Sequence, residues 1–335
     1  SYSVTWLKHC QNYTDLIVDR FHLGSDSQVV EIASNDGCLL KCFQGKGIPV
    51  LGIEPAKNIA QIAETSGVPT LAEFFNSQIA KKLAAEGKQA DLLMGNNVLA
   101  HVPSLNDFVR GLKILLKPGG VITMEFPSLL RLMEENQFDT IYHEHFSYFS
   151  WLTAEKIFTH HGLCLFDVDE LETHGGSLRI YACHNGDSNK KVSNKVLLMK
   201  RQEIGLSKLS AYQNFSEQVK ETKKNLISLL SELKKSGKSI SGYGAPAKGN
   251  TLLNYCGIGA NFIDYTVDLN PHKQGRFLPG THIPIYHPDK IRETRPDYLL
   301  ILPWNLKNEI ISQMEFISEW GGKFITPIPK AEVQS

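Results

Sequence analysis

The stretch Gln28-Val-Val-Glu-Ile-Ala-Ser-Asn-Asp-Gly37 decides the expected fold. Its apolar half predicts a buried strand over 28–33, and Asn-Asp-Gly predicts a turn into a helix through 39–43. The same rhythm recurs downstream, with strands expected over 48–53, 68–71, 91–95 and 121–126 and helices between them. Strands that alternate with helices predict βαβ units and a parallel sheet that is buried on both faces.

The rest of the chain predicts a second domain. An aromatic, His-rich segment over 128–150 precedes two strands, 163–168 and 177–183, which we expect to be antiparallel because few residues separate them. A Lys/Glu-rich amphipathic stretch predicts a helix that bridges two domains, and βα alternation then resumes. The predicted organisation is α/β throughout, with a first domain over 1–190, a bridging helix over 191–236 and a smaller domain over 237–330.

Composition excludes several classes of protein. Of 335 residues, 42% are hydrophobic and 21% charged, as in ordinary globular proteins, and 35 basic residues balance 35 acidic ones. This balance favours neither DNA nor RNA as a partner. No apolar run reaches the roughly 20 residues of a membrane span, and the first residues do not resemble a signal peptide. Six scattered Cys without a CxxC pair predict reduced thiols, so we expect a soluble, cytoplasmic protein without a membrane partner.

Polar residues follow three neighbouring strands of the first predicted sheet, where ligands bind in such folds. The turn after 28–33 lacks G-x-G-x-x-G, and its Asp carboxylate would repel a pyrophosphate. An acidic, glycine-poor turn suits S-adenosylmethionine, which carries an ammonium and a sulfonium and no phosphate, and a carboxylate after the second strand suits the ribose hydroxyls. The predicted cofactor-binding residues are Glu31, Ala33, Asn35, Asp36, Gly37, Glu54, Pro55, Asn96 and Asn97. A plain turn is the alternative interpretation of Asn35-Asp36-Gly37.

The segment Tyr142-His-Glu-His145 carries the candidate catalytic groups, and His101 follows another strand end. A histidine can take a proton at neutral pH, a carboxylate such as Glu144 can orient it, and Tyr142 can donate to a developing oxyanion. If the segment is extended, Tyr142 and Glu144 face one way and His145 the other; if it is turned, the pairing changes. The sequence HEH is not HExxH, so we expect no metal.

A glycine-rich loop, Gly242–Thr251, leads from a strand into a helix in the second domain. Its free N–H groups and one lysine are typical of an anion site, and two further cationic residues beyond the next strand suit a diphosphate. A solvated charged face is the alternative. With a Gly-Gly turn of the first domain, the predicted substrate-binding residues are His174, Gly175, Gly176, Tyr243, Gly244, Lys248, Asn270, Lys273 and Arg276.

Seven stretches together resemble the S-adenosylmethionine-dependent sugar C-methyltransferases of deoxysugar biosynthesis, including 3-C-methyltransferases. They are Val30–Gly37, Gly52–Ala56, Asn97–Pro103, Tyr142–Phe146, His174–Gly176, Gly242–Lys248 and Lys273–Arg276. The resemblance implies a class I methyltransferase Rossmann-like domain followed by a smaller Rossmann-like domain that closes the nucleotide-sugar site. It also implies that His101, Tyr142, Glu144 and His145 line the active site, with His145 as the favoured base. Family members usually begin with a Cys-rich zinc module and a Tyr-containing linker, neither of which is found in this sequence.

The expected reaction is methylation of a carbon next to the keto group of a nucleotide-linked deoxyhexose through an enolate, which leaves S-adenosylhomocysteine. One alternative is a NAD(P)-dependent nucleotide-sugar epimerase or dehydrogenase. It lacks G-x-G-x-x-G, and Pro288 interrupts the single YxxxK match, Tyr286–Lys290. The other alternative is a catalytically silent protein that binds cofactor or sugar.

Overall fold

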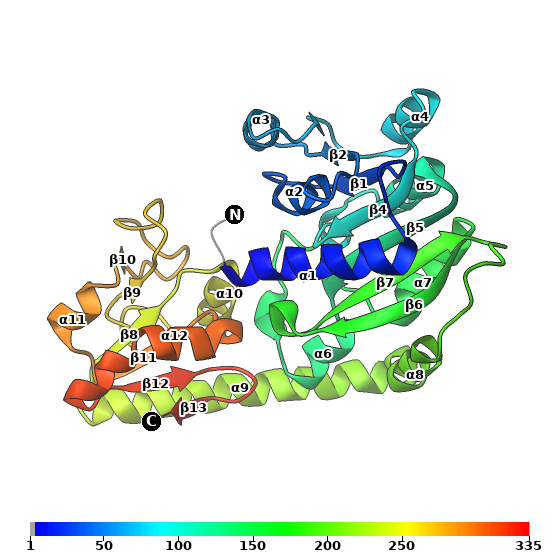
Figure 1. Cartoon of the computed structure of the whole chain (residues 1–335). Coiled ribbons are helices and arrows are strands. Elements are labelled where there is room, and N and C mark those ends of the chain that lie inside the picture. The colour runs from blue at the N-terminus through cyan, green and yellow to red at the C-terminus, as the bar shows by residue number, and fades with distance from the viewer. Residues whose placement is uncertain (1–3, 335) are drawn as a thin grey trace. The chain divides into compact units, whose positions relative to one another are not determined.

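The structure is a computed structural model, and it describes residues 4–334. The chain divides into two compact units (Figure 1). The first contains the residues up to Ser128 together with Phe146–Ile204, and the second contains Leu129–His145 together with the chain from Gly205 onward.

The first unit is built on a seven-stranded sheet of order β3-β2-β1-β4-β5-β7-β6. Its strands are β1 (Val29–Ile32), β2 (Val50–Ile53), β3 (Thr70–Leu71), β4 (Ala90–Asn96), β5 (Leu116–Pro127), β6 (Leu163–Leu171) and β7 (Ser177–His184). The first five strands are parallel, whereas β7 is antiparallel to both β5 and β6. The expected parallel sheet with an antiparallel closing pair is thereby confirmed.

Helices cover both faces of this sheet because neighbouring residues of each strand point to opposite sides. Val29 packs in the cluster beneath α1 and α2, whereas Val30 packs in the cluster beneath α4, α5 and α7. Figure 1 shows α1 running across the sheet. The helices of this unit are α1 (Val4–Phe21), α2 (Cys38–Gln44), α3 (Lys57–Thr65), α4 (Ser77–Ala85), α5 (Leu105–Leu115), α7 (Trp151–His160) and α8 (Asn194–Glu203), with 3₁₀ turns η1 (Leu99–His101) and η3 (Thr173–Gly175).

The second unit has a six-stranded sheet of order β10-β9-β8-β11-β12-β13, parallel except for β13. Its strands are β8 (Ile240–Tyr243), β9 (Thr266–Val267), β10 (Ile285–Tyr286), β11 (Tyr298–Ile301), β12 (Lys323–Thr326) and β13 (Glu332–Gln334). Its helices are α6 (Leu129–Glu134), α9 (Leu209–Lys235), α10 (Ala247–Cys256), α11 (Lys290–Thr294) and α12 (Lys307–Gln313), with 3₁₀ turns η2 (Phe138–Thr140), η5 (Trp304–Leu306) and η6 (Glu315–Trp320). Side chains of α9 and α10 share one core cluster, and those of α11 and α12 share another.

The structure differs from the sequence prediction at two places that affect the site. The helix expected over 191–236 is interrupted by the 3₁₀ turn η4 (Ile204–Ser207), because Met199 of α8 packs in the first core whereas Leu226 of α9 packs in the second. The segment Leu129–His145, which the division at 190 placed in the first domain, groups with the second unit. Phe138 explains this grouping, because its ring is buried in the core of the second unit.

Strand β9 is only two residues long, for a local reason. The N–H groups of Phe262 and Ile263 both donate to the carbonyl of Gly259, so this part of the chain forms a tight turn. Two short strands, β10 and β13, carry no pattern that predicted them.

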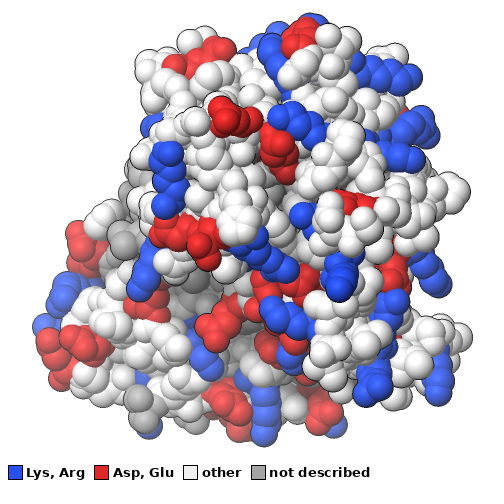
Figure 2. All heavy atoms as spheres, turned by 45° about the vertical axis from the view of Figure 1, so that its right-hand side comes forward, with Lys and Arg blue, Asp and Glu red and all other residues white. Residues whose placement is uncertain are grey.

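Charged side chains of both signs are interspersed over the face that Figure 2 shows. The chain contains equal numbers of basic and acidic residues, 35 of each. Among residues 4–334, no helix has the length and apolar character needed to cross a bilayer.

Candidate active site

The turn between β1 and α2 is built from left-handed backbone. Ala33, Asn35 and Gly37 have φ values of 57°, 50° and 74°. Asn tolerates this region, whereas Ala stores strain there, as is common at binding sites. The N–H of Ala33 is tied to the carbonyl of Ile53 at 2.7 Å. A Cβ on Gly37 would lie 2.9 Å from the Val68 side chain, so packing also demands this glycine.

Glu54 links this turn to the end of β2. One of its oxygens, Oε2, accepts the N–H of Asn35 at 3.0 Å, and Oε1 accepts the N–H of Ala56 at 2.9 Å, across Pro55. The carboxylate is buried and held rigidly by two backbone donors. Since each carboxylate oxygen has a second lone pair, it can still accept a hydroxyl from a ligand.

Unsatisfied polar atoms are buried at the ends of the neighbouring strands. Glu31 Oε2 and both polar atoms of the Asn96 side chain make no hydrogen bond to any residue within 4–334. Burial raises the pKa of Glu31 well above its usual range. The N–H of Asn97, whose φ is 53°, donates to the carbonyl of Glu125 at 2.9 Å. Because buried polar groups are normally paired, these residues fit a ligand that supplies polar partners.

The Tyr142–His145 segment is turned, since the N–H of His145 donates to the carbonyl of Tyr142 at 3.0 Å. The extended alternative is therefore wrong. The turn brings the Tyr142 and His145 rings to a centroid distance of 4.5 Å, while His143 and Glu144 are exposed. His145 Nδ1 lies 2.8 Å from the Thr140 carbonyl. A carbonyl oxygen only accepts, so this contact makes Nδ1 the protonated nitrogen and leaves the Nε2 lone pair as a base.

His101 ends the 3₁₀ turn η1 of the first unit and is exposed. The preceding carbonyl, that of Ala100, accepts the N–H of Phe146 at 2.8 Å and that of Ser147 at 3.3 Å. The residues directly after His145 are thus hydrogen-bonded to the turn that carries His101.

The predicted substrate-binding residues divide between the two units. Gly175 and Gly176, with φ values of 88° and 110°, form a turn before β7, and the Gly176 carbonyl accepts the N–H of Ser128. The side chain of His174 lies outside the described part of the structure. In the second unit, the Tyr243 ring is buried in the core, and its hydroxyl donates to Gln313 Oε1 at 3.1 Å. Tyr243 therefore has a clear packing role.

The two cationic loops of the second unit lie together at the carboxyl edge of its sheet. Lys273 Nζ donates to the Ala245 carbonyl at 3.0 Å and contacts Asp268 Oδ2 at 3.3 Å. Asp268 also accepts the N–H of Ala245 at 2.8 Å. Asn270 caps its own loop by accepting the N–H of His272, and Arg276 is exposed.

Gly244, with φ 89°, leads into α10, and a Cβ there would lie 2.6 Å from Pro303. Lys248 in the first turn of α10 is directed inward. Its Nζ donates to Asn305 Oδ1 at 2.8 Å and lies 4.4 Å from the centroid of the Trp304 ring. Burial lowers the pKa of Lys248.

Comparison with known proteins now gives the family. A family described as "C-methyltransferase C-terminal domain" matches residues 172–329, and one described as "Methyltransferase domain" matches residues 7–167. The chain is 36% identical over 330 residues to the C-methyltransferase NovU of Streptomyces niveus, covering 98% of this chain and 79% of that protein. The chain belongs to the C-methyltransferase family. The enzyme is thus an S-adenosylmethionine-dependent C-methyltransferase.

Further similarities cover parts of the chain. The ubiquinone biosynthesis O-methyltransferase of Roseobacter denitrificans is 33% identical over 98 residues, which is 28% of this C-methyltransferase and 38% of that protein. Among solved structures, PH0226 of Pyrococcus horikoshii gives a TM-score of 0.44 at 15% identity, covering 55% of this chain and 93% of that one. Magnesium protoporphyrin IX methyltransferase of Synechocystis with bound SAH gives 0.42 at 15% identity, covering 52% and 83%. The class I methyltransferase fold expected for the first unit is confirmed by the methyltransferase-domain match over residues 7–167 together with the strand order β3-β2-β1-β4-β5-β7-β6.

The buried polar atoms of Glu31 and Asn96, with the acceptors of Glu54, fit the ammonium, adenine and hydroxyl groups of S-adenosylmethionine. Within residues 4–334, no group of three or more His, Cys, Asp or Glu side chains could hold a metal ion.

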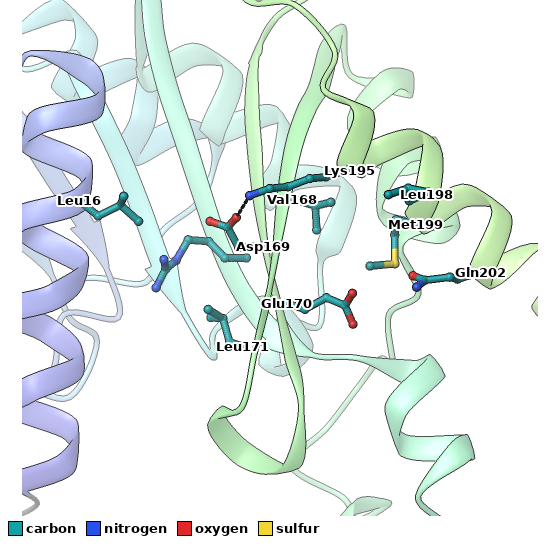
Figure 3. A pocket seen from close by; sticks show the side chains of 10 residues that line it. Leu16, Val168, Asp169, Glu170, Leu171, Lys195, Leu198, Met199 and Gln202 are labelled. Atoms are coloured by element: carbon teal, nitrogen blue, oxygen red, sulfur yellow. Dashed lines mark hydrogen bonds and ion pairs between the residues drawn. The ribbon is translucent and has the colours of Figure 1, made fainter.

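A cavity of about 580 Å³ lies along β6 and α8 of the first unit (Figure 3). Among the residues that line it, Leu16 and Leu198 are exposed apolar side chains, and Lys195 forms an ion pair with Asp169 at 2.5 Å. None of the predicted site residues whose side chains the structure describes lines this cavity.

Sequence reasoning missed one buried cluster of the second unit. The carboxyl group of Asp139 is fully buried, and its Oδ2 accepts the indole N–H of Trp304 at 2.7 Å. The two residues are 165 positions apart, so no local pattern could connect them. Burial raises the pKa of Asp139 to about 7, although the positive charge of Lys248 acts to lower it.

The raised pKa of Asp139 makes stability depend on pH. Between about pH 3.8 and 7 the unfolded chain has released this proton, while the folded enzyme retains it. The contribution of Asp139 to stability is therefore full below the pKa of this side chain in the unfolded chain. It is lost as the pH rises through the pKa of the same side chain in the folded enzyme. Relative to Asp139→Asn, the wild type should lose about 1.4 kcal/mol of unfolding free energy per pH unit across this window. Urea titrations at several pH values measure this difference; parallel curves for the two proteins would contradict it.

Proposed function

We propose that the enzyme methylates a carbon next to the keto group of a nucleotide-linked deoxyhexose, and that the reaction passes through an enolate with His145 as the base. We further assign cofactor binding to the first unit and nucleotide-sugar binding to the second. What supports the choice of base is the contact of His145 Nδ1 with the Thr140 carbonyl, because it leaves Nε2 as a proton acceptor.

The proposed steps use the chain's own side chains. A keto group acidifies the neighbouring C–H, and His145 Nε2 takes that proton. The hydroxyl of Tyr142 and the imidazole of His101 donate to the enolate oxygen, which stabilises the charge that develops there. S-adenosylmethionine supplies the electrophilic methyl group. The protein holds the carbanionic carbon in line with this methyl group, and His145 retains the proton that it has taken from the substrate.

The cationic loops at the carboxyl edge of the second sheet support a diphosphate-linked substrate. Lys273 and Arg276 follow β9, whereas Lys248 in the first turn of α10 is directed toward Asn305 and the Trp304 ring. Asp268 partly neutralises Lys273, so exposed Arg276 and the backbone N–H groups at the start of α10 are the groups that we assign to the phosphates.

The decisive experiment separates proton removal from methyl transfer. The enzyme is incubated in D₂O with nucleoside-diphosphate 4-keto-deoxyhexoses, with and without S-adenosylmethionine. Deuterium should enter the α carbon without cofactor, and one methyl group should be added with it, as read by mass spectrometry. Binding of both ligands with neither event would indicate the silent binding protein. A change in nicotinamide absorbance would instead support the alternative of an NAD(P)-dependent oxidoreductase. The C-methyltransferase match over 98% of the chain does not favour that alternative.

Glu54→Gln should weaken binding of S-adenosylmethionine by about 10- to 100-fold, because hydrogen bonds to a charged acceptor contribute about 1.5–3 kcal/mol. The amide would also turn an N–H₂ group toward a backbone N–H that the carboxylate now accepts. Calorimetric titration gives the affinity. Glu73→Gln is the matched control, since Glu73 is an exposed carboxylate just after β3. Equal affinities in the two variants would remove Glu54 from the cofactor site.

A further inference from the structure

Asp139, Trp304 and Lys248 form a buried cluster in the second unit. Trp304 is almost fully buried; its indole N–H donates to Asp139, and Lys248 Nζ lies 4.4 Å from the centroid of its ring. Asp139 Oδ1 makes no hydrogen bond to any described residue. The charged and titratable groups that interact with this carboxyl are Lys248 and Cys256, both from α10. A buried carboxyl with one hydrogen bond is costly, so a role beyond packing is expected.

Asp139 of this cluster lies in the same segment as His145, the proposed catalytic base. Asp139 belongs to η2, and the next residue is Thr140, whose carbonyl lies 2.8 Å from His145 Nδ1. Thr140 is itself held by its N–H and its hydroxyl, which both donate to the Gln137 carbonyl, at 3.1 and 2.8 Å. The Asp139 side chain thus ties the backbone that orients His145 to the body of the second unit.

Two contacts made by residues before Asp139 also hold the segment in place. The Phe138 ring meets Tyr255 edge-on at a centroid distance of 5.2 Å. The Asn136 amide donates to Thr222 Oγ1 at 2.5 Å. Both contacts precede Asp139 in the chain. The Asp139–Trp304 hydrogen bond is made by the residue directly before Thr140.

We propose that Asp139, held by Trp304, is a positioning residue that fixes the Thr140 carbonyl against His145 Nδ1 and thereby selects Nε2 as the base. The inference rests on the proposed function for its catalytic consequence. The orientation of the imidazole, however, can be observed without any turnover. Asp139 acts through Thr140 and His145, and no contact between Asp139 and substrate is required.

The test combines kinetics with ¹⁵N NMR of the full chain labelled at histidine. In the wild type His145 should be the neutral Nδ1–H tautomer, with exposed His143 as the internal reference. Asp139→Ala should mix the two tautomers and lower kcat by about 10- to 100-fold, within the range that a positioned base contributes. KM and the affinity for S-adenosylmethionine should change less than about two-fold, since proton transfer rather than binding is affected.

Conservative variants separate positioning from folding. Asp139→Asn keeps an oxygen that accepts the Trp304 N–H, so it should restore the tautomer and most of kcat. Trp304→Phe removes that N–H but keeps an aromatic ring, so it should reproduce the Asp139→Ala result. If the alanine variant fails to fold, the same measurements on Trp304→Phe test the proposal. Asp289→Ala, at an exposed carboxylate of the same unit, should change nothing.

The results that overturn the proposal are distinct from those that overturn the proposed function. If Asp139→Ala and Trp304→Phe lower only the melting temperature, with tautomer and kcat unchanged, Asp139 is structural. If His145→Gln keeps full activity, His145 is not the base, whereas the tautomer measurement still decides whether Asp139 orients it.

Discussion

Replacing His145 by Gln should lower methyl transfer by about 10²- to 10⁴-fold, which is the usual contribution of a positioned general base. Glutamine has similar reach, but its amide cannot accept a proton at neutral pH. Affinity for S-adenosylmethionine should stay within about two-fold, because the residues assigned to the cofactor belong to the first unit and His145 to the second. Steady-state kinetics and calorimetry on the same preparation give both numbers.

The matched control for this variant is His143→Gln. His143 lies two positions earlier in the same segment and is exposed, so the change in composition is identical. It should keep nearly full activity. Deuterium exchange at the α carbon should fall in parallel with methyl transfer in His145→Gln alone. If exchange persists while methylation stops, another group removes the proton, and the assignment of the base is wrong.

Much of the fold could be predicted from the sequence because each βα unit is local. Strand residues such as Val29 and Val30 are apolar in succession, and the structure shows that they enter the two different cores on either side of the sheet. The first five strands, the antiparallel pair and the βα order of the second unit followed from this pattern. Short strands such as β10 and β13 did not, because two or three residues on an edge carry no periodicity.

The site was predictable only where its parts are close in sequence. The turn from Ala33 to Gly37 is contiguous, so its unusual backbone could be anticipated from Asn-Asp-Gly. The partners of Asp139 and of Lys248 could not, because Trp304 and Asn305 are brought to them by the fold. Lys248 illustrates the limit: a lysine at a helix start predicts an anion site, whereas in the structure its charge is directed toward an indole ring and a buried carboxyl.

Loss of Arg179 should destabilise the first unit by about 3–5 kcal/mol, because it leaves a buried charge without its partner. Arg179 and Glu125 are paired across β7 and β5, with Nε to Oε1 at 2.7 Å, and both are almost fully buried. His9 of α1 approaches the other oxygen at 3.1 Å. Burial alone would raise the pKa of Glu125, but His9 and Arg179 hold it below its usual range. We expect Arg179→Met to be severe, whereas Arg179→Met combined with Glu125→Leu should recover most of the loss.

The double variant decides between two explanations of that loss. If the cost is an uncompensated charge, removing Glu125 restores stability, and the defect of the single variant shrinks as pH falls and Glu125 takes a proton. If the cost is lost packing around the Tyr13 ring, which the guanidinium covers at 4.5 Å, the double variant stays unstable at every pH. Hydrogen exchange of peptides from β5 in increasing urea measures this unit separately from the other. Arg110→Met, at an exposed ion pair with Asp107, is the control and should change stability by less than about 0.5 kcal/mol.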